Sequence, residues 1–247
     1  MTVSPNFAVI TAVLFDWDFT LAYSLGLHVS HIARTAALFQ SYGVACTEGD
    51  VAAAQASLEA DITRGVMAGS LRPQKKREII QLYRQLLHRL DHPDGSYKFA
   101  YEIYAGYGRL PHHLFDDVQP TLRQLKTRQL QLGILSNHSS SVRQTIEQLL
   151  GDIIPQDRLT ISEEVGVHKP SKTIFRRAAA RLRQDPATCL YVGDNLEVDA
   201  IAAVVNGEFA GGIWIDREDK GGKLPLPDKV LRITSLAQLS LFFRQKA

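Results

Sequence analysis

The sequence is poor in several features that would point to particular classes of protein. Its only two cysteines, Cys46 and Cys189, are far apart and form no CxxC pair, which argues against a zinc site built on cysteine and favours reduced thiols. No Lys or Arg precedes Arg34, so the chain lacks the charged start of a signal peptide. Its most apolar early run, residues 7–15, is far shorter than the roughly 20 residues of a membrane helix. We therefore expect a cytoplasmic protein without a membrane partner.

Charge of one sign is also scarce. The 28 Lys and Arg residues nearly balance the 26 Asp and Glu residues, which leaves a formal net charge of +2. So small an excess gives no reason to expect a nucleic-acid partner. The 247 residues suffice for one large domain, or for one domain with a smaller one inserted. Internal repeats and low-complexity tracts are missing, and nothing in the sequence predicts the oligomeric state.

Apolar runs rich in β-branched residues predict the strands of a buried sheet. They are residues 9–15, 130–135, 159–161, 189–192 and 209–215. Helical periodicity lies between them, at residues 141–150, 173–182 and 198–205. Strands that alternate with helices are typical of a parallel sheet with helices on both faces. The sequence thus predicts an α/β protein with a doubly wound, Rossmann-like core.

Residues 22–112 interrupt this alternation. The segment shows no convincing strand, and its periodicity predicts four helices, at residues 28–39, 50–63, 74–90 and 98–107. Glycines and the turn at residues 92–95 separate them. We expect an α/β core made of residues 1–21 and 113–247, with an all-helical domain of residues 22–112 inserted after the first strand.

Polar side chains follow the predicted strands. In an open parallel sheet, ligands bind at the carboxyl ends of the strands. The segments found there are Asp16-Trp17-Asp18-Phe19-Thr20, Ser136-Asn137-His138, Lys169-Pro170, and Gly193-Asp194 to Asp199. Carboxylate, hydroxyl and ammonium groups should therefore converge at one edge of the sheet.

This set of groups suits a phosphate and a metal ion. Several carboxylates in one cleft repel each other and need a cation to stay ionised. Oxygen ligands favour Mg²⁺, which binds few protein carboxylates and leaves room for a phosphate. Lys169 and Ser136 offer a positive charge and a hydroxyl donor for phosphate oxygens. Phosphoryl transfer needs mainly positioning and charge neutralisation, which such residues can provide.

The four segments resemble, in order, the four motifs of the haloacid dehalogenase-like hydrolase superfamily. The first motif is DxDxT, here residues 16–20, and the second is an apolar run ending in Ser or Thr, here residues 132–136. The third is a Lys often followed by Pro, here Lys169-Pro170, and the fourth is GDxxxxD, here residues 193–199. The resemblance covers the predicted α/β part of the chain. Four motifs in order are far more specific than one.

The resemblance implies roles for these residues. Asp16 would be the nucleophile that forms an aspartyl-phosphate, and Asp18 would be the general acid and then the general base. Asp16, Asp194 and the main-chain carbonyl of Asp18 would hold Mg²⁺, with Asp199 at or just outside the metal shell. Phosphate would be bound by Ser136, by Lys169 and by the backbone near Asn137.

The same resemblance suggests a reaction and a substrate class. The name-giving dehalogenases lack a carboxylate at the position of Asp18, so its presence favours phosphate chemistry. We expect a phosphatase of a small phosphorylated metabolite, such as phosphoglycolate, a sugar phosphate or a nucleoside monophosphate. The inserted helices would be a cap of the family's first type, which closes over the substrate. Candidate cap contacts are His28, Arg72, Lys75, Lys76 and the tyrosine-rich stretch 97–107.

One residue departs from the family pattern. Phe19 replaces the usual glycine of the first motif, and glycine is favoured where the backbone is tight or a ligand approaches closely. A regulatory or binding protein that kept the fold but little activity is therefore an alternative, as is a phosphomutase. A phospho-receiver module fits less well, because such modules are compact and lack a long insertion.

Simpler interpretations exist for most of these residues. The aspartates, Asn195 and Ser136 are common helix-capping residues, and a lone lysine is most often at the surface. The basic residues 72–77 suggest a solvated helix face, and the tyrosines at 97, 101, 104 and 107 suggest a packed stripe. We assign no role to His138 and His168 and expect Trp17 to pack or to line the entrance to the cap.

Overall fold

The computed structural model describes residues 3–25, 30–71, 73, 75–219, 221–222 and 224–243. The chain divides into two compact units. One, the α/β unit, comprises Met1–Tyr23, His113–His138 and Arg143–Ala247. The other, the helical unit, comprises Ser24–His112 with Ser139–Val142. None of the helices in the described residues is long and apolar enough to cross a membrane.

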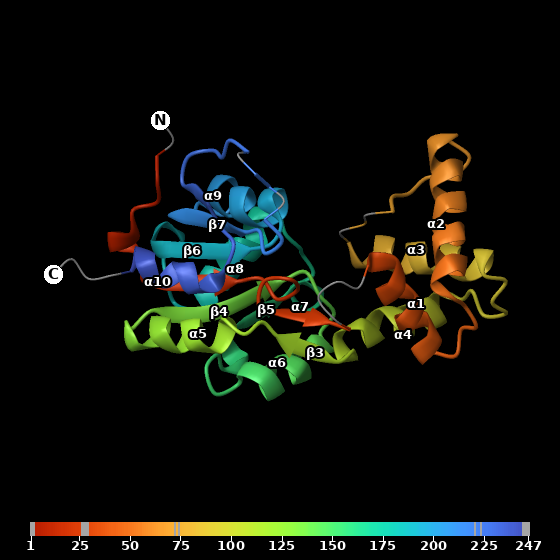
Figure 1. The fold of residues 1–247 in the computed structure, drawn as a ribbon, viewed down its shortest axis with the longest axis horizontal. Coiled ribbons are helices and arrows are strands. Elements are labelled where there is room, and N and C mark those ends of the chain that lie inside the picture. Colours follow the sequence, from red (N-terminus) through yellow and green to blue (C-terminus); the bar gives the residue numbers. More distant parts are fainter. Residues whose placement is uncertain are drawn as a thin grey trace. The chain divides into compact units, whose positions relative to one another are not determined.

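The α/β unit is built on a six-stranded sheet, in which every neighbouring pair of strands is parallel (Figure 1). The strand order is β5-β4-β1-β6-β7-β8. The strands are β1 (Ala12–Phe15), β4 (Gln131–Ser136), β5 (Leu159–Ile161), β6 (Cys189–Gly193), β7 (Gly211–Ile215) and β8 (Val230–Ile233). Strands β4 and β5 extend the sheet on one side of β1, and β6 to β8 extend it on the other. The side of the sheet to which successive strands are added therefore changes at β1, and open sheets form a binding crevice at such a point.

Helices cover both faces of this sheet, as a strand buried on both sides requires. Alternate residues of β1 and β6, such as Leu14 and Tyr191, pack with Ile174 and Phe175 in one apolar core. The helices of this unit are α5 (Val118–Thr127), α6 (Val142–Leu150), α7 (Ser162–Val165), α8 (Lys172–Arg181), α9 (Ala202–Val205) and α10 (Leu239–Phe242), with a π-helix at Leu196–Ile201. Short 3₁₀ turns lie at Phe7–Val9, Gln156–Arg158, Pro186–Thr188 and Leu236–Gln238. The fold class predicted from the sequence is confirmed.

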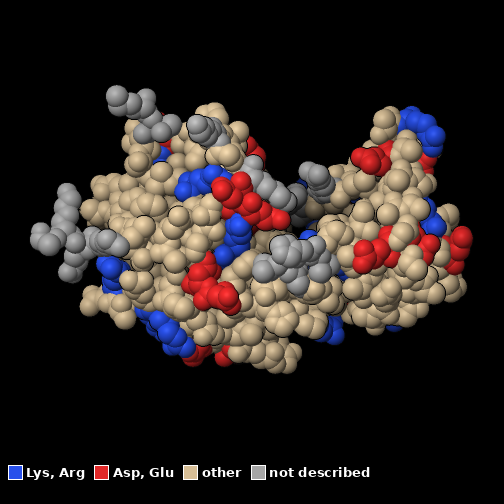
Figure 2. Space-filling model, in the orientation of Figure 1, with Lys and Arg blue, Asp and Glu red and all other residues tan. Residues whose placement is uncertain are grey.

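The helical unit has a separate apolar core. Its helices are α1 (His31–Ser41), α2 (Glu48–Thr63), α3 (Lys76–Arg89) and α4 (Tyr97–Gly106), followed by a 3₁₀ turn at Tyr107–Arg109. Leu38, Phe39, Ile80, Leu86 and Ile103 are among its fully or almost fully buried side chains. On the face drawn in Figure 2, the helical unit exposes both acidic and basic side chains.

The expectation that residues 22–112 contain no strand was wrong at both ends of the segment. Two three-residue strands, β2 (Ala22–Ser24) and β3 (His112–Leu114), form a small separate sheet. They lie where the chain leaves and re-enters the α/β unit. Strands this short carry too little periodicity to be seen in a sequence.

Other differences concern the edges of the α/β unit. Helix α5 and the edge strand β8 were not predicted, and the strand predicted at residues 9–15 is shorter, because Val9 ends a 3₁₀ turn and β1 begins only at Ala12. Strand β8 has the sequence Val-Leu-Arg-Ile, and a polar residue in so short a run obscures the signal of a buried strand. Cys46 and Cys189 are both free and buried, as expected.

Candidate active site

Three of the four predicted motifs follow strands that are neighbours in the sheet. Asp16 follows β1, Ser136 ends β4, and Asp194 follows β6. Because β1 pairs with both β4 and β6, these three strand ends lie at one edge of the sheet. The main-chain N–H of Asp16 donates to the carbonyl of Val192 at 2.9 Å, which extends the β1–β6 pairing up to the candidate nucleophile.

Three carboxylates of this edge form a tight cluster. Asp16, Asp194 and Asp199 each place a carboxylate oxygen within 4.8 Å of the others. Asp16 is 7% exposed and Asp199 is 1% exposed. The π-helix brings Asp199 back against Gly193, where a Cβ atom would come within 2.4 Å of the Asp199 side chain. The glycine of the fourth motif is therefore needed so that Asp199 can pack there.

Lys169 is the cation of the cluster. Its Nζ lies 2.8 Å from Oδ1 of Asp16 and 2.6 Å from Oδ1 of Asp199. The residue is only 2% exposed, so the alternative interpretation as a surface lysine is wrong. Its main chain is held as well, because the Asn137 amide accepts from the Lys169 N–H at 2.7 Å and donates to its carbonyl at 3.0 Å.

Burial and mutual repulsion dominate the electrostatics of these groups. Burial raises the pKa of Asp16 to about 6, although Lys169 acts in the opposite direction. Burial, with repulsion from Asp16 and Asp199, raises the pKa of Asp194 well above its ordinary value of 3.8. Burial alone would lower the pKa of Lys169, but the carboxylates of Asp16 and Asp199 raise it well above its usual range. The cluster holds more negative charge than one ammonium can balance.

The donor set suits a divalent cation. The three ionised carboxylates and the Lys169 ammonium together carry an excess of about two negative charges, which one divalent ion would neutralise. All the available donors are hard carboxylate oxygens, the type preferred by Mg²⁺. Asp16 and Asp194 are the residues best suited to ligate such an ion, because both carboxylate oxygens of Asp199 are already engaged, one by Lys169 and the other by the Asn195 N–H at 3.0 Å.

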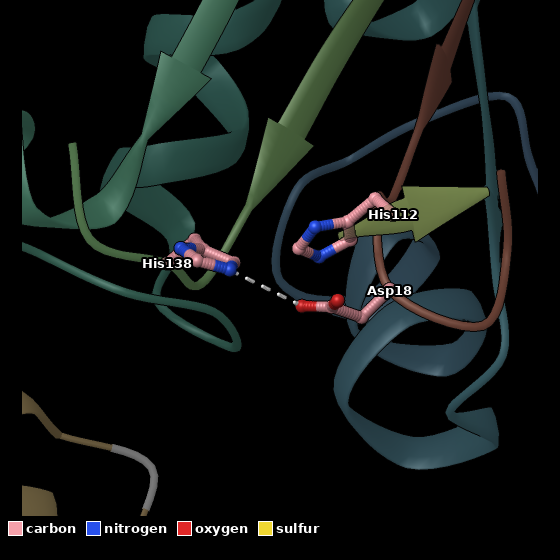
Figure 3. A group of neighbouring side chains, drawn as sticks. All are labelled: Asp18, His112 and His138. Carbon is pink, nitrogen blue, oxygen red and sulfur yellow. Dashed lines mark ion pairs between the residues drawn. The ribbon is translucent and has the colours of Figure 1, made fainter. Parts of the chain in front are cut away.

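The second aspartate of the first motif lies apart from the carboxylate cluster. The Asp18 side chain is 22% exposed, and its Oδ2 lies 3.6 Å from Nε2 of His138 (Figure 3). His138 is 4% exposed, and its backbone is tied to Ser162 by hydrogen bonds of 3.1 and 3.3 Å. Sequence reasoning assigned no role to His138. Its place two residues after the second motif was the only available signal, since loop histidines are common.

The last residue of the second motif and the two residues after it all lie in the site. Ser136 is 2% exposed at the end of β4, Asn137 holds Lys169, and His138 lies beside Asp18. The Asn137 side chain thus binds the Lys169 backbone through both its oxygen and its nitrogen, which fits the prediction that main-chain groups near Asn137 make the phosphate contact.

The backbone of the first motif explains the family's glycine. Phe19 has a φ of +55°, a left-handed conformation that glycine adopts readily and other residues adopt at a cost of roughly 1–2 kcal/mol. The Phe19 N–H nevertheless donates to the carbonyl of Ala22 at 2.7 Å, and Trp17 is fully buried. Phenylalanine therefore strains the loop without preventing it from forming.

A side chain from beyond β7 also holds this loop. Arg217 donates to the main-chain carbonyl of Thr20 at 2.6 Å and forms a two-pronged pair with Asp117, both contacts being 3.1 Å. Its guanidinium lies 3.6 Å from the centre of the Phe115 ring. Nothing in the sequence pattern singled out Arg217, because its partners are at least 100 residues away.

The predicted cap contacts have mixed outcomes. His28 and Arg72 lie outside the described residues. Lys75 is exposed, and Lys76 lies over the ring of Tyr101 at 4.6 Å. The expected tyrosine stripe is incomplete, because Tyr97 at the start of α4 is 49% exposed and only the later tyrosines pack against the core of the helical unit.

Two curated phosphatases are similar to part of this chain. Glyceraldehyde 3-phosphate phosphatase of Methanopyrus kandleri is 35% identical over 91 residues, which are 34% of this chain and 36% of that protein. N-acylneuraminate-9-phosphatase of Mus musculus is 32% identical over 122 residues, 48% of this chain and 46% of that protein. The chain thus matches less than half the length of each of these curated relatives.

Solved structures extend the likeness of the fold to nearly the whole chain. A HAD-hydrolase of Bacillus subtilis, whose structure is bound to magnesium, superimposes with a TM-score of 0.67. The two are 18% identical, and the match covers 95% of this chain and 99% of that one. The sequence model of the haloacid dehalogenase-like hydrolase family matches residues 10–207 of this chain. Since this match spans well over half of the sequence, the chain belongs to the haloacid dehalogenase-like hydrolase family.

Proposed function

We propose that this protein is a Mg²⁺-dependent phosphatase that transfers the phosphoryl group of a small metabolite to Asp16 and then to water. The contact between Lys169 and Asp16 inside a buried carboxylate cluster carries the proposal. A buried ammonium 2.8 Å from a carboxylate oxygen is well placed to contact a phosphoryl group attached to that carboxylate. Carboxylates that only supported the fold would not need to be buried together around one ammonium group.

The first chemical step forms a bond between a carboxylate oxygen of Asp16 and phosphorus. The bond from phosphorus to the ester oxygen breaks, and that oxygen leaves with a proton from Asp18. Lys169 and Ser136 bind the phosphoryl oxygens, together with the main chain near Asn137. The partly exposed Asp18 carboxyl can exchange protons with solvent, whereas Asp16 is nearly enclosed.

The second step returns the enzyme to its starting state. Asp18, now ionised, takes a proton from a water molecule, whose oxygen attacks phosphorus and releases Asp16. Asp16, Asp194 and the Asp18 carbonyl would hold Mg²⁺, with Asp199 supporting the cluster through Lys169. When bound, Mg²⁺ would supply positive charge that offsets repulsion between the attacking carboxylate and the phosphate oxygens.

The substrate class follows from the relatives named above, which act on phosphate esters of small metabolites. Each matches less than half of its length to this chain, so their individual substrates serve as candidates. We place specificity in residues 22–112, which we interpret as the family's cap domain. This assignment stays a prediction, and it expects substitutions at Lys75 and Lys76 to change KM more than kcat.

The test is phosphate release by purified protein with Mg²⁺. The panel includes an aryl phosphate, glyceraldehyde 3-phosphate, phosphoserine, phosphoglycolate, sugar phosphates and nucleoside monophosphates. The proposal expects turnover of at least one ester, loss of turnover in excess chelator, and recovery when Mg²⁺ is restored. Undiminished activity in chelator would refute the metal requirement.

A matched pair of variants guards against a contaminating phosphatase. Asp16→Asn removes the candidate nucleophile, whereas Asp50→Asn changes a carboxylate at the surface of the helical unit. The proposal expects activity to disappear in the first variant and to remain in the second. Equal activity in both would show that the phosphate is released elsewhere.

A further inference from the structure

The Lys169 ammonium has three N–H groups and three close partners. They are Asp16 at 2.8 Å, Asp199 at 2.6 Å and the hydroxyl of Tyr191 at 2.9 Å. The contacts to Asp199 and Tyr191 are hydrogen bonds, whereas the contact to Asp16 is an ion pair. A lysine ammonium has three donors and no acceptor, so two of its donors are used by Asp199 and Tyr191. Two of the partners belong to the family's motifs, and Tyr191 does not.

Tyr191 is fixed in the middle of the sheet. It lies in β6, opposite Leu14 of β1 and Gly212 of β7. The residue is fully buried, and its ring packs against Phe175 with a centroid separation of 5.4 Å. A side chain that is packed in this way keeps its hydroxyl group in one position.

The direction of the hydroxyl proton is fixed as well. The Tyr191 hydroxyl donates to the main-chain carbonyl of Leu135 at 2.6 Å, directly before Ser136. Since a tyrosine hydroxyl has only one proton, it can meet Lys169 only as an acceptor. It therefore fixes one N–H of the ammonium, and Asp199 fixes another.

We propose that Tyr191 is a positioning residue that holds the Lys169 ammonium beside Asp16, where it can contact a phosphoryl group bound there. Tyr191 and Asp199 hold the ammonium from behind, while Asn137 holds the backbone of the same residue. The same hydroxyl links Lys169 to the end of β4, so it joins the third motif to the second. This inference rests on the proposed phosphatase function.

The test is Tyr191→Phe, which removes the hydroxyl and keeps the ring. Tyr83→Phe is the matched control, because Tyr83 is also buried but lies in helix α3 of the helical unit. Both variants are assayed for kcat, KM and melting temperature, well below the melting transition. We expect Tyr191→Phe to lower kcat about tenfold with little change in KM, since a small misplacement of a charge-stabilising group acts on the transition state. Tyr83→Phe should leave kcat unchanged.

A double-mutant cycle distinguishes positioning from general destabilisation. If Tyr191 acts through Lys169, then Tyr191→Phe should cause no further loss of rate in a Lys169→Ala background. A kcat within twofold of wild type in Tyr191→Phe, or an equal loss with and without Lys169, would overturn the inference. If Lys169→Ala itself kept the wild-type rate, or if wild type released no phosphate, the proposed function would fail and the positioning role with it.

Discussion

Two carboxylates of the helical unit and two carboxylates of the candidate active site are in opposite electrostatic situations. In the helical unit, Asp50 accepts from the Thr47 hydroxyl and N–H at 2.7 and 2.8 Å, and these bonds lower its pKa. Asp94 is similar, since hydrogen bonds from Ser96 lower its pKa. In the α/β unit, burial raises the pKa of Asp16 and of Asp194.

This contrast distinguishes carboxylates that stabilise the folded protein from carboxylates that destabilise it. A carboxylate whose pKa is lowered is more stable ionised in the folded protein than in the unfolded chain, and the opposite holds for one whose pKa is raised. Asp50 closes a capping box at the start of helix α2. Asp16 and Asp194 reduce stability unless a cation joins them, which is the expected condition of a site built for chemistry.

The largest expected effect is that of Asp16→Asn on catalysis. Without the nucleophile, kcat for the best substrate should fall by at least about 10³-fold, since the carboxylate that forms the covalent intermediate is lost. Asp50→Asn should leave kcat unchanged. Steady-state kinetics of the two variants measures the contrast between the units directly, and equal losses of rate would erase it.

Asp18→Asn should have the next largest effect. Loss of general acid and base catalysis should lower kcat by roughly 10²- to 10⁴-fold. Binding of inorganic phosphate in the presence of Mg²⁺ should persist, because Lys169 and Ser136 are unchanged. Calorimetric titration measures the binding. A wild-type rate would remove Asp18 from the mechanism, and lost binding would give it a different role.

Asp194→Asn should stabilise the protein in the absence of divalent ions. Folding raises the pKa of Asp194 above the value of about 4 that it has in the unfolded chain. The stability that the protonated carboxyl contributes is therefore lost as the pH rises from the unfolded-state pKa toward the folded-state pKa. Asparagine cannot ionise, so the gain should be larger at pH 8 than at pH 5, and at least about 1 kcal/mol.

Thermal unfolding with and without Mg²⁺ completes this prediction. Mg²⁺ should raise the melting temperature of wild type, because it binds the folded state, and should raise that of Asp194→Asn much less. A variant that is less stable than wild type at pH 8 without metal, or that responds fully to Mg²⁺, would contradict the account.

The smallest expected effect concerns the helical unit. Thr47→Ala removes the N-cap of helix α2, where the hydroxyl accepts from the Asp50 N–H at 3.2 Å. Loss of such a cap costs about 1 kcal/mol of stability. Denaturant unfolding should show this loss, while kcat stays as in wild type. A drop in kcat for this variant would mean that the N-cap residue of helix α2 affects the reaction as well as the stability.

The sequence was informative where a continuous apolar run ends at a polar residue. Buried parallel strands appear as continuous apolar runs, and the polar residues that end them are easily seen. The sequence alone therefore suffices to place Asp16, Ser136 and Asp194 at the same sheet edge. Lys169 needed the order of the motifs, since no local pattern distinguishes a buried lysine from a surface one.

The residues missed by the sequence act through distant contacts. Tyr191 looks like an ordinary residue of an apolar strand, and its role depends on Lys169, 22 positions away. Arg217 holds the carbonyl of Thr20, 197 positions away. Such pairs leave no periodic signal along the chain. The strands β2 and β3 were missed because three residues are too few for a pattern.

The most direct test of the central claim is to trap the phosphoryl group on Asp16. Protein turning over its best substrate with Mg²⁺ is treated with borohydride, which reduces an acyl phosphate to an alcohol, and the peptide containing Asp16 is analysed by mass spectrometry. The account predicts homoserine at position 16, and none when substrate or Mg²⁺ is left out. Unmodified aspartate at position 16 during active turnover, or modification at Asp18 or Asp194 instead, would contradict it.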